Sequence, residues 1–173
     1  STALANGSHT WSVTATDAAG NVSPASPDFT LVVDTTAPNA PVISQAVDDV
    51  GTITGPVSSG QSTDDTIPRL VGTSEPFATV NIYEGTTLVG TGTADASGNW
   101  SILLTTTLAT GPHSFTAQAT DAAGNTSAPS ATFNLTIDTT PPAQPVLSSI
   151  VDDVGNAATP VANGGLTNDA QPT

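Results

Sequence analysis

The chain has 173 residues, with 15 acidic residues, a single basic residue (Arg69) and a formal net charge of −14. A nucleic-acid-binding protein needs a basic surface, and anionic lipid repels so acidic a chain, so this composition excludes both classes of partner. Cysteine is absent, which excludes a disulfide framework and thiol chemistry. Among the acids, 13 are Asp and two are Glu. This bias favours loops and cation ligands over helix surfaces.

The sequence repeats itself at a fixed offset of 104 residues. TDAAGN stands at 16–21 and again at 120–125, and VDDVG stands at 47–51 and at 151–155. A unit of this length is the size of an ordinary domain, not of a solenoid repeat. Neither terminus is expected to be natural. The predicted organisation is the last third of one repeat (1–37), a complete repeat (38–141) and the first third of the next (142–173).

Short strands are predicted throughout the complete repeat, because apolar residues alternate with polar ones between clusters of Gly, Pro, Asn and Asp. No amphipathic helix of useful length is expected. The predicted strands are 41–46, 67–73, 79–84, 87–94, 99–104, 113–120 and 131–137. Seven short strands in about 100 residues predict an all-β fold of tandem immunoglobulin-like antiparallel β-sandwiches. The expected core residues are Leu70, Val80, Ile82, Trp100, Ile102, Phe115, Phe133, Leu135 and Ile137, with Trp11 as a core residue of the preceding repeat.

Proline-rich linkers join the predicted repeats. DTTAPNAPV (34–42) and DTTPPAQPV (138–146) fall between the last strand of one repeat and the first strand of the next. Proline fixes φ and removes a hydrogen-bond donor, so we expect these linkers to be short and stiff.

Acidic residues are predicted to collect at the ends of the sandwich, because loops gather there. The connection between the first two strands brings Asp48, Asp49, Asp64 and Asp65 to the end from which the linker leaves, where Asp138 lies. Carboxylates crowded in this way repel one another unless a cation lies between them. Oxygen-rich Asp clusters suit Ca²⁺, and no His or Cys group suggests zinc.

An alternative applies to the Asp residues in the tight loops. In ADASGN (94–99) and TDAAGN, Asp also closes a hairpin by bonding to its own backbone. For Asp95 the hairpin role is preferred, for Asp121 both interpretations stay open, and for the acids near the linker the metal role is preferred. His9 and His113 are interpreted as packing or turn residues.

Several segments resemble the bacterial Ig-like repeats of giant non-fimbrial adhesins that are exported by type I secretion. They are TDDTIPRLVGTSEPFATVNIYEG, ADASGNWSILL, GPHSFTAQATDAAGN and IDTTPP. The resemblance implies Ig sandwiches on a bacterial cell surface with Ca²⁺ at or near the joints. Asn168 stands where the complete repeat has Asp64, which weakens the equivalent site. The implied ligands are Asp17, Asp34, Asp48, Asp49, Asp64, Asp65, Asp121, Asp138, Asp152, Asp153 and Asp169.

Three functions remain open on sequence alone. The first is a non-catalytic stalk repeat in cell adhesion or biofilm formation, whose partners are its neighbouring repeats and, through a distal domain, a host or abiotic surface. The second is a module that recognises glycan or a like repeat. The third is an accessory module of a secreted hydrolase. Catalysis in the chain itself is not expected, because no nucleophile–base arrangement and no pair of acids in a cleft is apparent.

Overall fold

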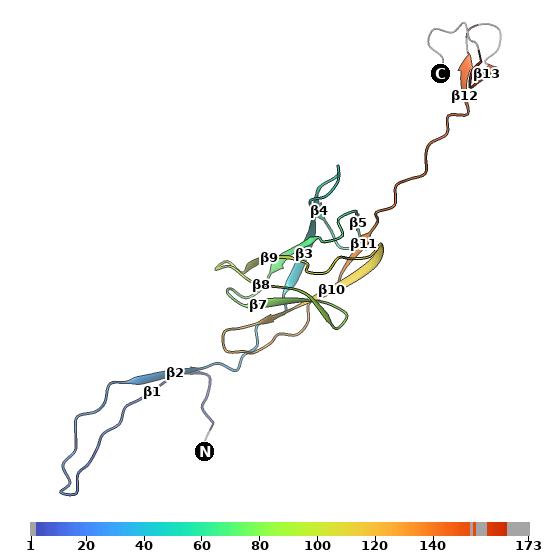
Figure 1. The fold of residues 1–173 in the computed structure, drawn as a ribbon. Helices are drawn as coiled ribbons and strands as arrows, with labels where there is room; N and C mark the ends of the chain where they lie inside the picture. Colours follow the sequence, from blue (N-terminus) through green and yellow to red (C-terminus); the bar gives the residue numbers. More distant parts are fainter. Residues whose placement is uncertain (1–2, 153, 155–158, 166–173) are drawn as a thin grey trace. The chain divides into compact units, whose positions relative to one another are not determined.

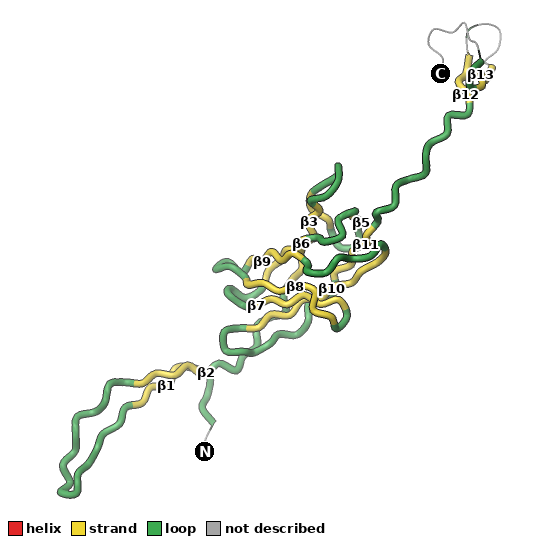
Figure 2. The backbone as a smooth tube through the Cα atoms, in the orientation of Figure 1, coloured by secondary structure: helices red, strands yellow, loops and turns green. Residues whose placement is uncertain are grey.

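The computed structural model describes residues 3–152, 154 and 159–165, and these form two compact units, residues 1–139 and 140–173. The described residues contain strands, turns and loops and no helix, as the alternating pattern predicted (Figure 2). None of them therefore forms a helix that could span a membrane. The fold is all-β.

The complete repeat consists of two sheets (Figure 1). Neighbouring strands are antiparallel except β5 and β11, which are parallel. One sheet has the order β5 (Ser62–Thr63), β11 (Phe133–Ile137), β10 (Gly111–Thr120), β7 (Thr79–Glu84) and β8 (Thr87–Thr93). The other has the order β4 (Gly55–Val57), β3 (Val42–Asp48), β6 (Arg69–Thr73) and β9 (Asn99–Leu103).

The core of the complete repeat draws residues from both sheets. All nine residues expected there in this repeat are buried. Val89, Leu104 and Leu108 join them, although the expected core did not include these three residues. Gly72 is required beneath the Trp100 ring, since a Cβ at this position would lie 2.4 Å from that ring and 1.9 Å from the Val42 carbonyl oxygen.

The first 37 residues contain a hairpin that copies two strands of the complete repeat. β1 (Gly7–Trp11) pairs with β2 (Phe29–Val33), and every pair in this register has a counterpart 104 residues later between β10 and β11. Trp11, expected in a core, is 41% exposed, because no second sheet covers this hairpin in the structure.

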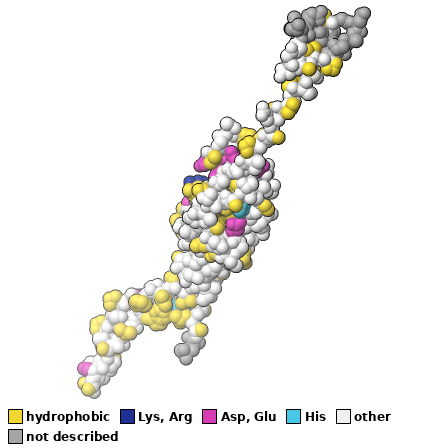
Figure 3. All heavy atoms as spheres, turned by 45° about the vertical axis from the view of Figure 1, so that its right-hand side comes forward, with side chains coloured by type: hydrophobic (Ala, Val, Ile, Leu, Met, Phe, Trp, Pro, Cys, Tyr) yellow, Lys and Arg dark blue, Asp and Glu magenta, His cyan; other side chains and the backbone are white. Residues whose placement is uncertain are grey.

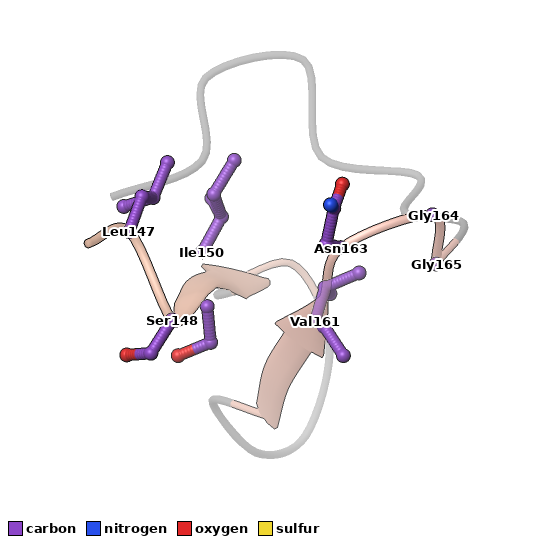
Figure 4. Close-up of a pocket in the computed structure, with 9 residues that line it drawn as sticks. Leu147, Ser148, Ile150, Val161, Asn163, Gly164 and Gly165 are labelled. Atoms are coloured by element: carbon purple, nitrogen blue, oxygen red, sulfur yellow. The ribbon is translucent and has the colours of Figure 1, made fainter.

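The second unit contains another copied hairpin. β12 (Ser149–Asp152) pairs with β13 (Thr159–Ala162), and the pairs Ile150–Val161 and Val151–Pro160 correspond to Ala46–Val57 and Val47–Pro56. A hollow in this unit is lined by Leu147, Ile150, Val161 and neighbouring polar residues (Figure 4). Counterparts of Ile150 and Val161 are buried in the complete repeat, so the hollow is the inner face of a sandwich hairpin and not a ligand site.

The long connection between β3 and β6 differs from the sequence expectation. It was predicted to be a loop, but it contains β4, which pairs with β3, and β5, which pairs with β11. The connection therefore crosses from one sheet to the other. Its two short strands fix the segment of residues 48–65, which carries four Asp residues, beside the end of β11.

Candidate functional site

The candidate site lies at the linker pole, which we define as residues 48–65, 104–111 and 138–139 of the complete repeat. β3 and β11 both end here, which delivers Asp48 and Asp138 to the same pole. The loops of residues 74–78, 94–98 and 121–125 follow β6, β8 and β10 and lie at the opposite pole. Acidic side chains gather at one end of the complete repeat in the space-filling view, and most of the visible surface carries no charged group (Figure 3).

Three of the predicted ligands share one hollow at the linker pole. Asp48, Asp64 and Asp138 line a hollow of about 280 Å³ together with polar residues of the same loops. The polar residues are Thr52, Ser62 and Thr63. The sequence analysis named the three acids but not the hydroxyl residues. The Ser-Thr pair directly before Asp64 is the sequence feature that could have indicated them.

A buried hydrogen-bonded chain backs one wall of this hollow, which Asp48 and Thr63 line and Asp65 does not. The Thr63 hydroxyl donates to Asp48 Oδ2 over 2.6 Å, and the Thr63 Oγ1 accepts from the Asp65 backbone N–H over 3.1 Å. The Asp65 Oδ1 in turn accepts from the Ile67 backbone N–H over 2.8 Å. Asp48, Thr63 and Asp65 are all buried. A buried carboxylate that is held by hydrogen bonds has a fixed direction, so this wall is rigid.

One carboxylate oxygen of Asp65 is buried without a hydrogen-bond partner among the described residues. Its Oδ2 is buried and has no hydrogen bond of normal geometry, although the Asp49 backbone N–H lies close enough to favour the ionised form. Desolvation raises the pKa of Asp65, and the charges of Asp49 and Asp48 raise it further. A buried carboxylate beside two others is costly unless a proton or a cation neutralises it.

The last residue of VDDVG, Gly51, has a backbone conformation and a close contact that require glycine. Its φ is +74°, a conformation that side chains disfavour, and a Cβ placed on it would lie 2.5 Å from Asp64 Oδ2. The glycine therefore lets the loop turn sharply and lets the Asp64 carboxylate approach the backbone. Asp49 lies in the same turn and is exposed.

The site residues in the tight loops have a different environment. Asp121 Oδ1 accepts from the backbone N–H groups of Ala123 and Asn125, at 2.9 and 2.8 Å, and its Oδ2 accepts from the Asn125 side chain at 2.9 Å. Asp17 and Asp95 repeat this arrangement in their own loops. These bonds favour the ionised form, with the Asn125 side chain as the largest cause for Asp121, and lower the pKa of each of the three carboxyl groups. Each carboxylate thus closes its own loop.

The remaining predicted ligands lie in or beyond the linkers. The Asp34 Oδ1 accepts from the Thr36 backbone N–H over 2.9 Å, and the Asp34 backbone carbonyl accepts from the Asn125 side chain over 3.1 Å. The second TDAAGN loop therefore contacts the linker before its repeat. The Asp152 backbone belongs to β12, while its side chain, Asp153 and Asp169 lie outside the described residues.

Carboxylate and hydroxyl oxygens are the ligands that a hard cation prefers. The Asp65 oxygen without a hydrogen-bond partner and the neighbouring acids are therefore chemically compatible with such a cation. However, no three His, Cys, Asp or Glu side chains in the described part of the chain are grouped closely enough to hold a metal by themselves. A cation here would therefore draw on carboxylates for charge and on hydroxyl, carbonyl or water oxygens for its remaining ligands.

A family comparison assigns the chain to a class. The bacterial Ig-like domain family matches residues 1–35 and 39–139, so the chain belongs to this family. This match covers the hairpin of the first 37 residues and the complete repeat, and the β-sandwich described above is consistent with it.

Individual relatives are more distant. The chain is 30% identical over 180 residues to exoglucanase B of Cellulomonas fimi, and it spans 94% of its own length but 15% of that enzyme. Among solved structures it is similar to a biofilm-associated protein BSP domain, with 23% identity and a TM-score of 0.41 over 78% of this chain and 20% of the other.

Proposed function

We propose that this chain is a structural segment of a tandem array, in which bacterial Ig-like repeats act as the non-catalytic stalk of a secreted surface adhesin. The observation that carries the proposal is the fixed offset of 104 residues, which the structure reproduces as identical strand registers in both partial repeats. Repeats built alike and joined by short linkers suit an element that spaces other domains.

The stalk proposal includes a Ca²⁺ ion at the linker pole. Asp48, Asp64 and Asp138, which line the hollow, would supply negative charge, and a cation there would lower the electrostatic cost of the nearby buried Asp65 carboxylate. Asp138 is the first residue of the linker, so a cation bound here would tie the linker to the repeat that it leaves. Such a tie would restrict the joint, which is the property that a stalk needs.

The cation is tested by calorimetric titration of the full chain with CaCl₂. Extracellular Ca²⁺ modules bind with dissociation constants of about 10⁻⁴–10⁻³ M, and we expect a value in this range. At about ten times the dissociation constant, one site adds about 1.4 kcal/mol to the free energy of unfolding. Absence of both binding heat and thermal stabilisation would contradict the cation proposal.

Matched variants identify the site. Asp64→Asn and Asp138→Asn should each weaken Ca²⁺ binding several-fold, since each removes a charge from the hollow. Asp28→Asn makes the same change of charge at an exposed residue outside the linker pole, and should leave the affinity unchanged. Equal effects of all three variants would mean that Ca²⁺ responds to overall charge and not to this site.

The stalk role needs a longer chain. Duplicating residues 38–141 in register within the full chain adds one complete repeat and one natural joint. Small-angle scattering should give a larger maximum dimension with Ca²⁺ than with excess chelator. If the protein binds Ca²⁺ but its maximum dimension does not change, the Ca²⁺ site stands and its proposed role in the joint is wrong.

The relative from Cellulomonas fimi supports a second candidate function, an accessory module of a secreted hydrolase. The two functions make different predictions for the gene that encodes this chain. An accessory module requires a catalytic domain in the same gene, whereas a stalk requires many further copies of the 104-residue unit.

A further inference from the structure

His113 is the third residue of β10, two residues beyond the linker pole, and has an acceptor at each ring nitrogen. Its Nδ1 is 2.6 Å from Glu84 Oε1, and its Nε2 is 2.8 Å from the Ala109 carbonyl oxygen. The ring stacks on Phe115, with ring centres 6.3 Å apart and planes at 12°. These contacts fix the orientation of the imidazole.

Two acceptors define the protonation state that this geometry favours. A neutral imidazole has one N–H group, so it can donate to only one of the two oxygens and must face the other with a lone pair. The imidazolium ion has two N–H groups and satisfies both acceptors. Carboxylic acids are ordinarily stronger acids than imidazolium ions, so we place the shared proton on the ring.

The elements near the ring carry few titratable side chains. β7 has Tyr83 and Glu84, whereas β8, β11 and residues 104–110, all of them described, have none. Desolvation lowers the pKa of His113, but the bonds to Ala109 and Glu84 and the Glu84 charge outweigh it, so the pKa is raised above 6.5.

The contacts of His113 extend to the linker. Ala109, which accepts from the ring, is followed by Thr110, whose hydroxyl lies 2.9 Å from the Thr139 hydroxyl. Thr139 is the second linker residue. The imidazolium therefore connects the end of β7, through the loop before β10, to the segment that leaves the repeat.

We propose that His113 and Glu84 form a proton-sensitive clamp that fastens residues 109–110, and with them the start of the linker, to the end of β7. The clamp is closed while the ring is doubly protonated and opens when the ring loses its second proton. Because the folded ring holds its proton more tightly than the unfolded one, the added stability is fully present below about pH 6.5 and is lost as the pH rises through the folded pKa. The clamp does not depend on the cation proposal.

Titration of the ring nitrogens by NMR tests the clamp in the full chain, with chelator present so that bound cations play no part. In the unmodified protein the His113 ring should stay doubly protonated to a higher pH than in Glu84→Gln, which retains an acceptor but removes the charge. The Thr110 and Thr139 amide shifts should follow the same titration. If Glu84→Gln leaves the His113 titration where it was, the clamp is wrong.

Unfolding measured between about pH 6 and 8 gives the second readout. One group changes the unfolding equilibrium constant by at most tenfold per pH unit, and we expect His113→Asn to remove part of the observed slope. His9 serves as the matched control, since its Nε2 has the same kind of carbonyl partner, Ala5 at 2.7 Å. Equal loss of slope in His9→Asn would overturn the proposal. Should His113→Asn not fold, the titration of the unmodified ring decides.

Discussion

The hairpins of residues 7–33 and 111–137 have the same register but different surroundings. Trp11 and Phe115 occupy equivalent positions, as do Phe29 and Phe133, yet Trp11 is 41% and Phe29 68% exposed while Phe115 is 0% and Phe133 3% exposed. The local sequence is therefore sufficient to specify strand pairing and turns. Burial comes from the facing sheet, which among the described residues only the complete repeat has.

Amide hydrogen exchange should show the largest difference between the hairpins. Two strands without a facing sheet are marginally stable, so the β1 and β2 amides should exchange almost freely. Those of β10 and β11 should be protected by about 10³-fold or more, since opening them requires unfolding of the complete repeat. Comparable protection in both hairpins would show that pairing alone stabilises them.

A matched pair of truncations should give the next largest effect. Phe115→Ala removes a fully buried ring and should lower the free energy of unfolding by about 3–5 kcal/mol. Trp11→Ala at the equivalent position should change it by less than about 0.5 kcal/mol. Urea denaturation followed by circular dichroism measures both. A large effect of Trp11→Ala would reveal a partner for the exposed face.

A buried hydroxyl provides a smaller test. Ser127 Oγ accepts from the Ala119 backbone N–H over 3.0 Å and is buried, whereas Ser23 Oγ accepts from Ala15 at the same distance but is exposed. Ser127→Ala leaves a buried donor unsatisfied and should lower the free energy of unfolding by about 1–3 kcal/mol. In Ser23→Ala, water replaces the hydroxyl and thermal denaturation should show no change.

The Asp loops should give the smallest effect, visible only in acid. Because the folded pKa of Asp121 is lowered, its contribution to stability is present above about pH 4 and is lost as the pH falls through the folded value. Asp121→Asn should therefore reduce the acid sensitivity of unfolding. Asp17→Asn changes an identical loop and should not alter unfolding of the complete repeat. Acid titrations followed by circular dichroism distinguish the two.

The strands and core were predictable because both depend on a local pattern. Predicted strands and observed strands differ by two residues or fewer at each end, and the alternation at Trp100 and Ile102 identified buried positions correctly. The two strands in residues 55–63 were missed, because they depend on pairing with β3 and β11 and have no alternation of their own.

The candidate site was predictable only as a set of acids at one pole. Chain order places Asp48 and Asp138 at the same end of the sandwich, but it does not show that Thr63 lies between Asp48 and Asp65. The pairing of Glu84 with His113 was also missed, and His113 was interpreted as a packing or turn residue. The two residues are 29 positions apart and meet only because β7 lies beside β10. A side-chain contact of this kind depends on which strands are neighbours in the sheet, and the local sequence pattern does not show that order.

The shared register of the two hairpins also creates a folding hazard. β2 has the backbone register that β11 uses beside β10, and Phe29, Leu31 and Val33 match Phe133, Leu135 and Ile137 in position and apolar character. A nascent β10 therefore meets two nearly equivalent partners in one chain, and pairing with the wrong one would exchange strands between neighbouring repeats. Sequence separation discriminates between them, since β11 begins 13 residues after Thr120 whereas β2 lies 78 residues before Gly111. The short loop that carries TDAAGN thus also directs each strand to its own repeat.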